Sequence, residues 1–533
     1  MDPTTWDGDE VRRYLSLGID RPDSDGASGT GTTAMVVGST GPFAQLAGRK
    51  VLEAGGSATD AVIATSLTQI ALAAGSWVSY AGVFAMVHTG GGRTDSLSAG
   101  YATFAEEDDP ASIPRAPEPS GRTALVPGFM AGVAAAHDRF GVLPWADLFG
   151  PAIHVAERGF PVGAIRAAQF DLRRDVLPES FRASRGDTFR QPELARTMRG
   201  IAADGADWMY RGPWAREFVE VVRAAGGRAG LDDLAGYAPL WADPVTVDFH
   251  GTEVHTIGRP DTGGAGLAEA LRLAGDVGDP LTDPQALHEL IRISRHAMRP
   301  GSHSDFVLAA DARGNVAAAC HSINTSLWGS TGLFAGGVSI PDSASFQQHL
   351  LARLTPGAHL PFPVNPAIAL RAGRPVLASS AIGAGLHCAT LQCLHGVLAL
   401  GIPVTEVVRR PMFHGPDYLA GDSVTTTVAE RMKGKQVGSV WQDAISRARE
   451  AGVPRERVWE TAMAAVPQVI EDGFDPEVLR RTEELGQSLA VRPAADRTIP
   501  RGFWGGIDLG VNTADGVLVG ARTPVSGGTV EGI

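Results

Sequence analysis

The pattern of apolar and polar residues predicts strands at both ends of the chain and helices between them. "TAMVVGS" (33–39) is a short apolar run typical of a buried strand. Residues 41–75 carry apolar side chains at helical spacing that breaks at Gly55-Gly56, which predicts two helices with Ser57 or Thr59 capping the second. "VFAMVHTGGGRTDSLSAG" (83–100) alternates around a glycine-rich turn and predicts a β-hairpin.

Helical spacing dominates from Val126 to about Leu273, and strand patterns return at Asp305. Each later pair of strands turns at Gly next to Asn, Asp or Arg, as tight hairpins require. The second half is predicted to contain two hairpins, a helix and a late strand pair: 305–324, 366–383, 386–401 and 504–524. Helices that cover antiparallel hairpins, without regular strand-helix alternation, indicate a layered α+β fold, an αββα sandwich.

The length of 533 residues fits one large layered fold or two or three units. Residues 1–33 are rich in Asp, Gly, Ser and Thr and lack periodicity, so we expect a flexible N-terminal arm. The amino terminus also lacks the basic start and apolar core of a secretory signal, which favours the cytoplasm. The most apolar window (61–75) is too short to cross a bilayer, so we expect a buried helix and no membrane partner.

The composition argues against several classes of partner and cofactor. A content of 44% hydrophobic and 20% charged residues is typical of a globular protein, and a net charge of −13 argues against a nucleic-acid partner. The odd set Cys320, Cys388 and Cys393 lacks metal-binding spacing and favours free buried thiols over a disulfide or zinc. We expect neither a metal nor a cofactor.

Two short motifs resemble known sites only superficially. "GTGTTA" (29–34) fits a dinucleotide-binding pattern, but that pattern needs a strand before it and a helix after it. "HELIR" (288–292) has Arg292 where a zinc protease has its second histidine, so a solvated helix face is favoured. The G-x-S-x-G and S-x-x-K patterns of common serine hydrolases are absent from the sequence.

Five blocks of the sequence stand in a recognisable order and spacing: "AGRKVLEAGGSATDAVIA" (47–64), residues 126–162, "LDDLAGYAP" (231–239), "RPMFHGPD" (410–417) and "DGVLVGARTP" (515–524). Through these blocks the chain resembles, over nearly its full length, the γ-glutamyltransferase family of N-terminal nucleophile (Ntn) hydrolases. In that family a precursor cuts itself before a Thr that opens a strand, followed by a D-x-x-G-N hairpin and an N-[ST]-[ST] turn.

The resemblance assigns roles to residues around the mid-chain stretch "RPGSHSDFVLAADARGNVAAACHSINTSLWG". Its nucleophile position falls on Ser304, which replaces the usual Thr. Ser322 falls on the hydroxyl that hydrogen-bonds the nucleophile, and Asn324 on an Asn that contacts substrate or the terminal amine. "SSAIGAG" (379–385) matches the family's Gly-Gly loop, with Gly383 and Ala384 as the expected oxyanion-binding amides.

Cleavage before Ser304 implies two parts, 34–303 and 304–533, that act together as a heterodimer on a small-molecule substrate. The chemistry is reasonable because a serine hydroxyl needs a base, and the α-amine exposed by cleavage, with a pKa of about 7.7 to 8, supplies one. The alternative is that Ser304, Ser322 and Asn324 have no catalytic role and only occupy strand or turn positions that favour Ser and Asn. His303 and His321 are expected to be structural.

At the positions where the family has its glutamate-binding residues, this sequence has other residues. Its Arg falls in "SLSAGYATF" (96–104), which has no Arg; its acidic pair falls near "PDSASF" (341–346) and its paired serines on "LPFPVNP" (360–366). A glutamyl pocket needs a fixed cation and fixed acceptors, so we expect a remodelled pocket and poor use of glutathione. The loop before the nucleophile is also nearly absent, which predicts a more open cleft.

Three hypotheses about function remain open. Family branches with altered pockets include amide hydrolases such as cephalosporin acylases, and a branch of 4-alkyl-L-proline natural-product (antibiotic) biosynthesis in which homologues hydrolyse a carbon–carbon bond and release an oxalyl fragment. The first hypothesis, which we favour, is the biosynthetic branch. The second is an amidohydrolase or a true γ-glutamyl hydrolase or transferase. The third hypothesis is a chain that stays uncut and inactive and serves as a binding protein.

Overall fold

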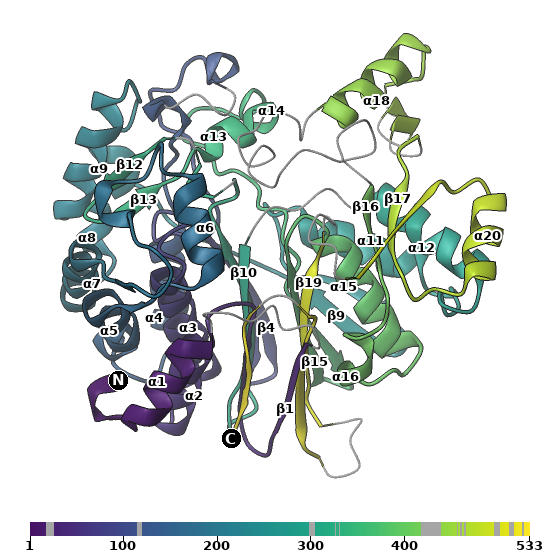
Figure 1. The fold of residues 1–533 in the computed structure, drawn as a ribbon, viewed down its shortest axis with the longest axis horizontal. Coiled ribbons are helices and arrows are strands. Elements are labelled where there is room, and N and C mark those ends of the chain that lie inside the picture. Colours follow the sequence, from purple (N-terminus) through teal and green to yellow (C-terminus); the bar gives the residue numbers. More distant parts are fainter. Residues whose placement is uncertain are drawn as a thin grey trace.

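The computed structural model describes residues 1–17, 26–114, 120–297, 304–325, 327–329, 331–416, 439–455, 457–458, 461–462, 465–494, 501–510, 516–524 and 527–533. Two antiparallel sheets of seven strands pack face to face between two layers of helices (Figure 1). This αββα sandwich confirms the predicted fold class.

One sheet, which we call the nucleophile sheet, contains the predicted nucleophile strand. In order across the sheet its strands are β21 (Val530–Gly532), β2 (Met35–Gly38), β10 (Ser304–Ala310), β11 (Val316–Ser322), β3 (Val83–Gly90), β4 (Arg93–Ala99) and β7 (Leu240–Ala242). The facing sheet consists of β1 (Ala27–Gly31), β20 (Leu518–Arg522), β19 (Phe503–Asp508), β15 (Arg374–Ile382), β14 (Ala367–Arg371), β9 (Thr252–Thr256) and β8 (Val245–Phe249).

Each sheet is covered by helices on its outer face. The nucleophile sheet is covered by helices of the first half of the chain: α1 (Gly8–Leu17), α2 (Pro42–Glu53), α3 (Ala58–Leu72), α4 (Phe129–Phe140), α5 (Gly150–Arg158), α6 (Ala164–Leu172), α7 (Pro192–Asp204), α8 (Asp207–Tyr210), α9 (Pro213–Ala224) and α10 (Leu231–Ala235). The facing sheet is covered by α11 (Gly263–Leu273), α12 (Pro284–Ala297), α15 (Leu386–Leu394), α16 (Val404–Val407) and α20 (Pro476–Glu484).

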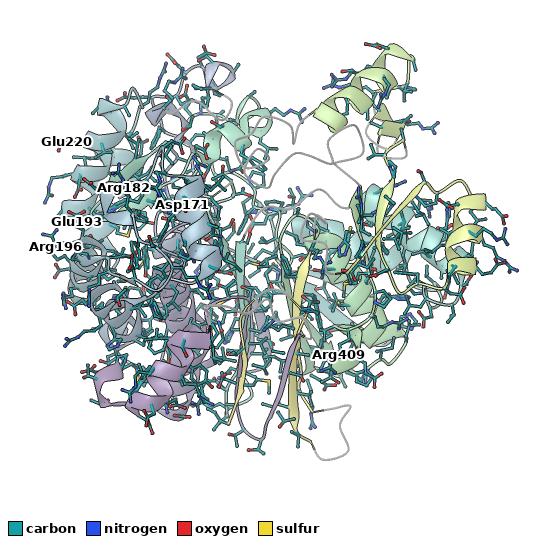
Figure 2. All side chains as sticks on the ribbon, in the orientation of Figure 1. Asp171, Arg182, Glu193, Arg196, Glu220 and Arg409 are labelled. Atoms are coloured by element: carbon teal, nitrogen blue, oxygen red, sulfur yellow. The ribbon has the colours of Figure 1, made fainter. Side chains whose placement is uncertain are left out.

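Smaller elements lie outside the four layers. These are the strand pairs β5 (Phe160–Pro161) with β6 (Thr188–Phe189) and β12 (Leu333–Ala335) with β13 (Val338–Ile340), the three-stranded sheet of β16 (Phe413–Pro416), β17 (Gln468–Glu471) and β18 (Leu489–Arg492), and the helices α13 (Ser343–Phe346), α14 (Gln348–Leu351) and α18 (Ser439–Glu450). Exposed charged side chains lie around the outside of the molecule (Figure 2), among them Asp171, Arg182, Glu193, Arg196, Glu220 and Arg409.

Burial explains why the predicted elements form. Between the sheets lies a core that includes Phe306, Leu308, Ala318 and Ile368. Strand β10 is buried along its whole length. Val307 and Ala309, which alternate with Phe306 and Leu308 along the strand, belong to a second core under the helices. The alternation of these side chains therefore assigns one face of β10 to each core.

Several sequence predictions are confirmed. The strand at 33–39 is β2, the two helices are α2 and α3, and the hairpins are β3–β4, β10–β11, β14–β15 and β19–β20. The window 61–75 falls mostly in α3, which is buried from Ala58 to Ala71, and the three cysteines are free and buried. Among the described residues, no helix combines the length and apolar character needed to span a membrane.

The described residues of the N-terminal segment 1–33 form a helix and a strand, whereas the sequence predicted a flexible arm. Helix α1 packs Val11 and Tyr14 into the core, and the Tyr14 hydroxyl donates a 2.7 Å hydrogen bond to Glu531. Strand β1 pairs with β20 at the edge of the facing sheet. Long-range partners at the far carboxyl end order this segment, and local composition does not reveal them.

Candidate active site

Strands β10 and β11 bring the two predicted serines together. Their antiparallel register pairs Ser304 directly with Ser322, and the "DARGN" turn connects the opposite end of the hairpin. In that turn Asp311 accepts hydrogen bonds from the amides of Arg313 (2.9 Å) and Asn315 (3.0 Å), while Gly314 has a φ of 82°. The local sequence thus fixes the register that places the two serines opposite one another.

Both serines are buried and face the space between the sheets. Phe306 and Cys320, each two residues from one of the serines along its strand, belong to the core between the sheets. Side chains two apart on a strand share a face, so Ser304 and Ser322 lie at the end of that core.

Asn324 follows in a tight bend at the end of β11. Its backbone amide donates a 2.7 Å hydrogen bond to the Ser322 hydroxyl oxygen, and its φ is 54°. Asn is one of the few residues that adopt the left-handed region at low cost. The predicted Ser322 and Asn324 are therefore directly linked in the structure.

The predicted oxyanion loop ends a strand of the facing sheet. Strand β15 packs across the core on β11, where the Cys320 thiol lies 3.3 Å from the Ser380 hydroxyl and 3.5 Å from the Ala381 carbonyl. Gly383 and Ala384 follow directly after this strand. Gly383 has a φ of 87°, so its backbone conformation suits glycine.

Two further packing contacts fix the direction of β15 relative to the serines. Phe306, near the Ser304 end of β10, lies against Gly505, the strand partner of Ser380. At the other end, Met35 lies against Gly520. Gly520 pairs with Ile507, and Ile507 with Ala378, the residue two positions before Ser380. Strand β15 therefore runs toward the Ser304 end, and its Gly383-Ala384 turn lies at that end of the sandwich.

A buried carboxylate adjoins the predicted nucleophile. Asp305 accepts hydrogen bonds from Ser39 (2.7 Å), Thr40 (2.8 Å) and the Trp77 indole (3.0 Å). Burial raises the pKa of Asp305 to about 6, while the three hydrogen bonds and the Arg166 charge act in the opposite direction. Sequence reasoning missed this residue, although an acidic side chain on the helix-facing side of an apolar strand was a usable signal.

The segments that depart from the family pattern are packed into the structure. Tyr101, where an Arg was sought, donates a 3.1 Å hydrogen bond to the Ile323 carbonyl, and Ser343 donates a 2.6 Å bond to the same oxygen. Asp342 accepts a 2.6 Å bond from Thr325. Phe362 is buried in the core between the sheets. Tyr101 and Ser343 were also missed by sequence reasoning.

Of the two histidines considered at the sequence level, His303 lies outside the described residues. His321 is fully buried beside Phe129, with ring centroids 5.6 Å apart, and burial lowers the pKa of its imidazole to about 3. A neutral ring in this position is consistent with the structural role expected for it.

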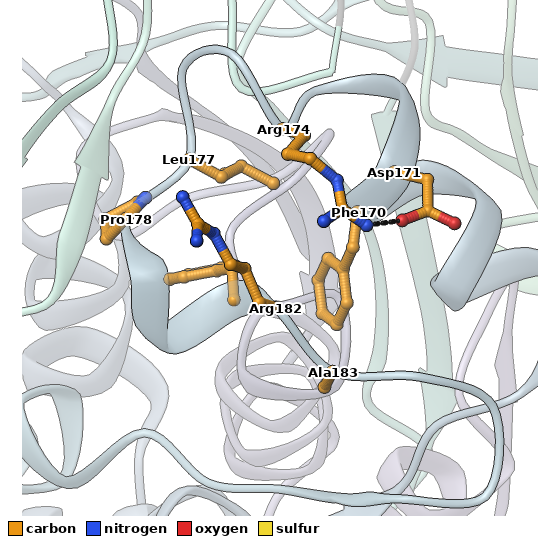
Figure 3. A pocket seen from close by; sticks show the side chains of 8 residues that line it. Phe170, Asp171, Arg174, Leu177, Pro178, Arg182 and Ala183 are labelled. Atoms are coloured by element: carbon orange, nitrogen blue, oxygen red, sulfur yellow. Dashed lines mark hydrogen bonds and ion pairs between the residues drawn. The ribbon is translucent and has the colours of Figure 1, made fainter.

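A small hollow lies away from these residues, between α6 and the turn that follows it (Figure 3). Phe170, Leu177 and Phe181 form its apolar wall, and Arg174 in its lining is paired with Asp171. None of the five predicted site residues lines it. Within the described ranges, no group of three or more His, Cys, Asp or Glu side chains is placed to hold a metal ion.

Known proteins resemble this chain in sequence and in fold. Residues 44–307 match the family model described as Gamma-glutamyltranspeptidase. A glutathione hydrolase proenzyme of Pseudomonas aeruginosa is 31% identical over 267 residues, which are 46% of this chain and 47% of that protein. The chain thus spans about half the length of the first curated relatives it matches.

A longer match is the acylase ACY 1 proenzyme of Pseudomonas sp. strain SE83, 27% identical over 470 residues, covering 72% of this chain and 82% of that protein. The crystal structure of cephalosporin acylase from Bacillus halodurans superposes with a TM-score of 0.76 at 18% identity, covering 95% of this chain and 97% of the other. This likeness shows that the two proteins share a fold.

Proposed function

Because the chain is related to the γ-glutamyltranspeptidase family, whose model matches residues 44–307, we propose that it is a self-cleaving acyl hydrolase with Ser304 as its nucleophile and a pocket that does not accept glutamate. The observation that carries this proposal is the register of the β10–β11 hairpin. It places Ser304 opposite Ser322 at the end of the sandwich where the Gly383-Ala384 turn also lies.

Maturation requires one intramolecular step. The Ser304 hydroxyl attacks the carbonyl carbon of residue 303, the peptide C–N bond breaks as an ester forms, and the nitrogen becomes the α-amine of Ser304. Water then hydrolyses the ester and leaves residue 303 as a free carboxylate. The step releases the base that the mature enzyme needs, because the new α-amine accepts the proton of its own hydroxyl.

Turnover uses the same hydroxyl a second time. Ser304 attacks the substrate's carbonyl, and the negative charge that develops on its oxygen needs hydrogen-bond donors that are already in place. The amides of Gly383 and Ala384 are proposed for this role. Ser322, held by the Asn324 amide, is proposed to hydrogen-bond the nucleophile. The adduct then collapses: the bond from the acyl carbon to the leaving nitrogen or carbon breaks, and the leaving group takes the proton held by the α-amine, which leaves an acyl-enzyme. Water hydrolyses the ester, which releases the acid and restores the Ser304 hydroxyl.

The pocket argues against a glutamyl substrate. The segment where the family has its Arg offers Tyr101, whose hydroxyl is directed to Ile323, and burial raises the pKa of that phenol so that it stays neutral. Asp342 is occupied by Thr325, and Phe362 is part of the core. These groups supply no free cation for an α-carboxylate, so an acyl group other than γ-glutamyl is proposed.

Two reactions fit an Ntn hydrolase with such a pocket. Amide hydrolysis is supported by the similarity to an acylase over 72% of the chain. Carbon–carbon bond hydrolysis with release of an oxalyl fragment, as in the branch of 4-alkyl-L-proline biosynthesis, uses the same acyl-enzyme on Ser304. The mass of the acyl group bound to the enzyme distinguishes them.

The test is a panel of γ-glutamyl-p-nitroanilide, oxamyl amides, aliphatic acyl amides and oxalyl-pyrroline compounds, assayed with wild type and with Ser304→Ala as the control. We expect the anilide to have a kcat/KM lower by orders of magnitude than the best acyl substrate, since each lost charge-assisted hydrogen bond costs about 1.5 to 3 kcal/mol. Ser304→Ala should be inactive on all of them. Rapid release of glutamate by wild type would restore plain γ-glutamyl chemistry.

A further inference from the structure

The carboxylate of Asp305 connects the nucleophile strand to two other segments. Ser39 and Thr40, which donate to it, precede α2, and Trp77 lies in the loop between α3 and β3. Ser39 also binds the next residue of β10 through its hydroxyl, which accepts a 2.9 Å bond from the Phe306 amide. The first residues of β10 are thus fixed from the helix-facing side, opposite to the face on which Ser304 lies.

Trp77 also contacts the bend that follows β11. Its carbonyl oxygen accepts a 3.2 Å hydrogen bond from the amide of Ile323, the residue between Ser322 and Asn324. Its indole meanwhile donates to Asp305. One residue therefore contacts both the strand that begins at Ser304 and the bend that follows Ser322.

Arg166 supplies the counter-charge from α6, which lies beside β10 (Figure 1). Its guanidinium stacks 4.8 Å from the Trp77 ring and donates to the Ser76 hydroxyl (2.9 Å) and the Ala73 carbonyl (2.9 Å). Burial lowers the pKa of Arg166 to about 10 and the Asp305 charge opposes that change, so Arg166 stays charged at neutral pH.

On these contacts we infer that Asp305 is a positioning residue for the proposed reaction: through Trp77 it holds Ser304 in register with Ser322 and Asn324, and its charge favours the protonated form of the neighbouring α-amine. The inference rests on the proposed function, because that amine exists only after cleavage. Among the described residues, Arg166 acts electrostatically on Asp305 and stays a cation. His321, the strand partner of Asp305 on β11, stays neutral, and burial raises the pKa of the nearby Cys320 thiol, which also stays neutral.

The pH dependence follows from the sign of these interactions. Above about pH 6 Asp305 is ionised, and a nearby negative charge raises the pKa of an amine. The amine acts as a base only when it is neutral, so kcat/KM falls on the acidic side as the amine becomes protonated. Removing the charge of Asp305 should therefore move this acidic limb to lower pH.

The experiment compares Asp305→Asn with Asp60→Asn, both made in the full chain and assayed with the fastest substrate of the panel. Asp60 is the matched control: it is a buried carboxylate at the start of α3 that accepts hydrogen bonds from the amides of Ser57, Val142 and Leu143. We expect both variants to lower the melting temperature. Only Asp305→Asn should lower kcat by about tenfold or more and shift the acidic limb of kcat/KM to lower pH.

Trp77→Phe provides a second variant if Asp305→Asn does not fold, since it removes the indole donor and keeps the ring. It should lower kcat several-fold with little change in KM. The inference is overturned if the variant that folds keeps the wild-type kcat and pH profile, or if Asp60→Asn shifts the profile equally. An uncut and inactive wild-type chain would instead overturn the proposed function, and this inference with it.

Discussion

Gly383 shows how one backbone position constrains the proposed oxyanion loop. A Cβ at this residue would lie 2.5 Å from the Arg501 carbonyl oxygen, which also accepts a 3.0 Å hydrogen bond from the Gly385 amide. An alanine here must both adopt a positive φ and displace that carbonyl. The positions of the loop's own amides would shift as a result.

We therefore predict that Gly383→Ala lowers kcat by at least tenfold and destabilises the fold. Gly373→Ala is the matched control, because Gly373 has a similar φ of 75° with nothing within 4 Å of its added Cβ. It should cost about 1 to 2 kcal/mol of unfolding free energy through backbone strain alone and leave kcat unchanged. Kinetics and denaturant unfolding of the two variants measure this; equal kcat in both would separate the loop from catalysis.

For single residues, the sequence predicted those that belong to a family motif. It missed the residues that hold the motif residues in place through hydrogen bonds. Ser304, Ser322 and Asn324 were located by counting along a hairpin, and the register places them together. Asp305 and Tyr101 contact groups far away in sequence, such as Trp77 and Ile323. Such pairs are set by tertiary packing. The sequence signals only that Asp305 is an acidic residue in an apolar strand, and it does not reveal the partners.

Helix α3 illustrates what an element adds to the sequence prediction. Ser57 and Thr59 were both capping candidates, and the structure selects Ser57: its hydroxyl accepts a 3.0 Å bond from the Asp60 amide while the Asp60 carboxylate accepts a 2.9 Å bond from the Ser57 amide. The Thr59 hydroxyl is buried without a hydrogen-bond partner among the described residues. Only Ser57 therefore makes a capping box.

Ser57→Ala should accordingly lower the free energy of unfolding by about 1 kcal/mol. Thr59→Val should leave it unchanged or raise it slightly, since the variant keeps the shape and removes an unpaired hydroxyl. Urea unfolding followed by circular dichroism measures both changes. A larger loss in Thr59→Val than in Ser57→Ala would show that the cap does not stabilise α3.

Most helices and hairpins were predictable because each is encoded by a local period and a turn. The β8–β9 hairpin was not, since it lies in a stretch where the sequence predicted helices. The ordered part of residues 1–33 was not, because β1 exists through its pairing with β20, almost 500 residues later in the chain. The same holds for β21, which joins the edge of the nucleophile sheet beside β2. Edge strands with such distant partners carry little periodicity of their own.

The whole molecule explains how a chain cut in the middle can stay together. In the nucleophile sheet, β10 and β11 of the second part lie between β2 and β3 of the first part. In the facing sheet, β14 pairs with β9 of the first part, and β20 pairs with β1, which lies in the N-terminal segment 1–33 that stays joined to the first part. Strands from both sides of the expected cut, 1–303 and 304–533, thus pair in both sheets. We expect the pieces to separate only when the protein unfolds.

The most direct measurement of the central claim is the intact mass of the purified chain under denaturing conditions, before and after incubation with an acyl substrate. The account predicts two species of 303 and 230 residues that co-elute under native conditions, and an acyl adduct on the 230-residue piece alone. A single species of 55.6 kDa that still turns over substrate would contradict it, since no α-amine would then exist at Ser304.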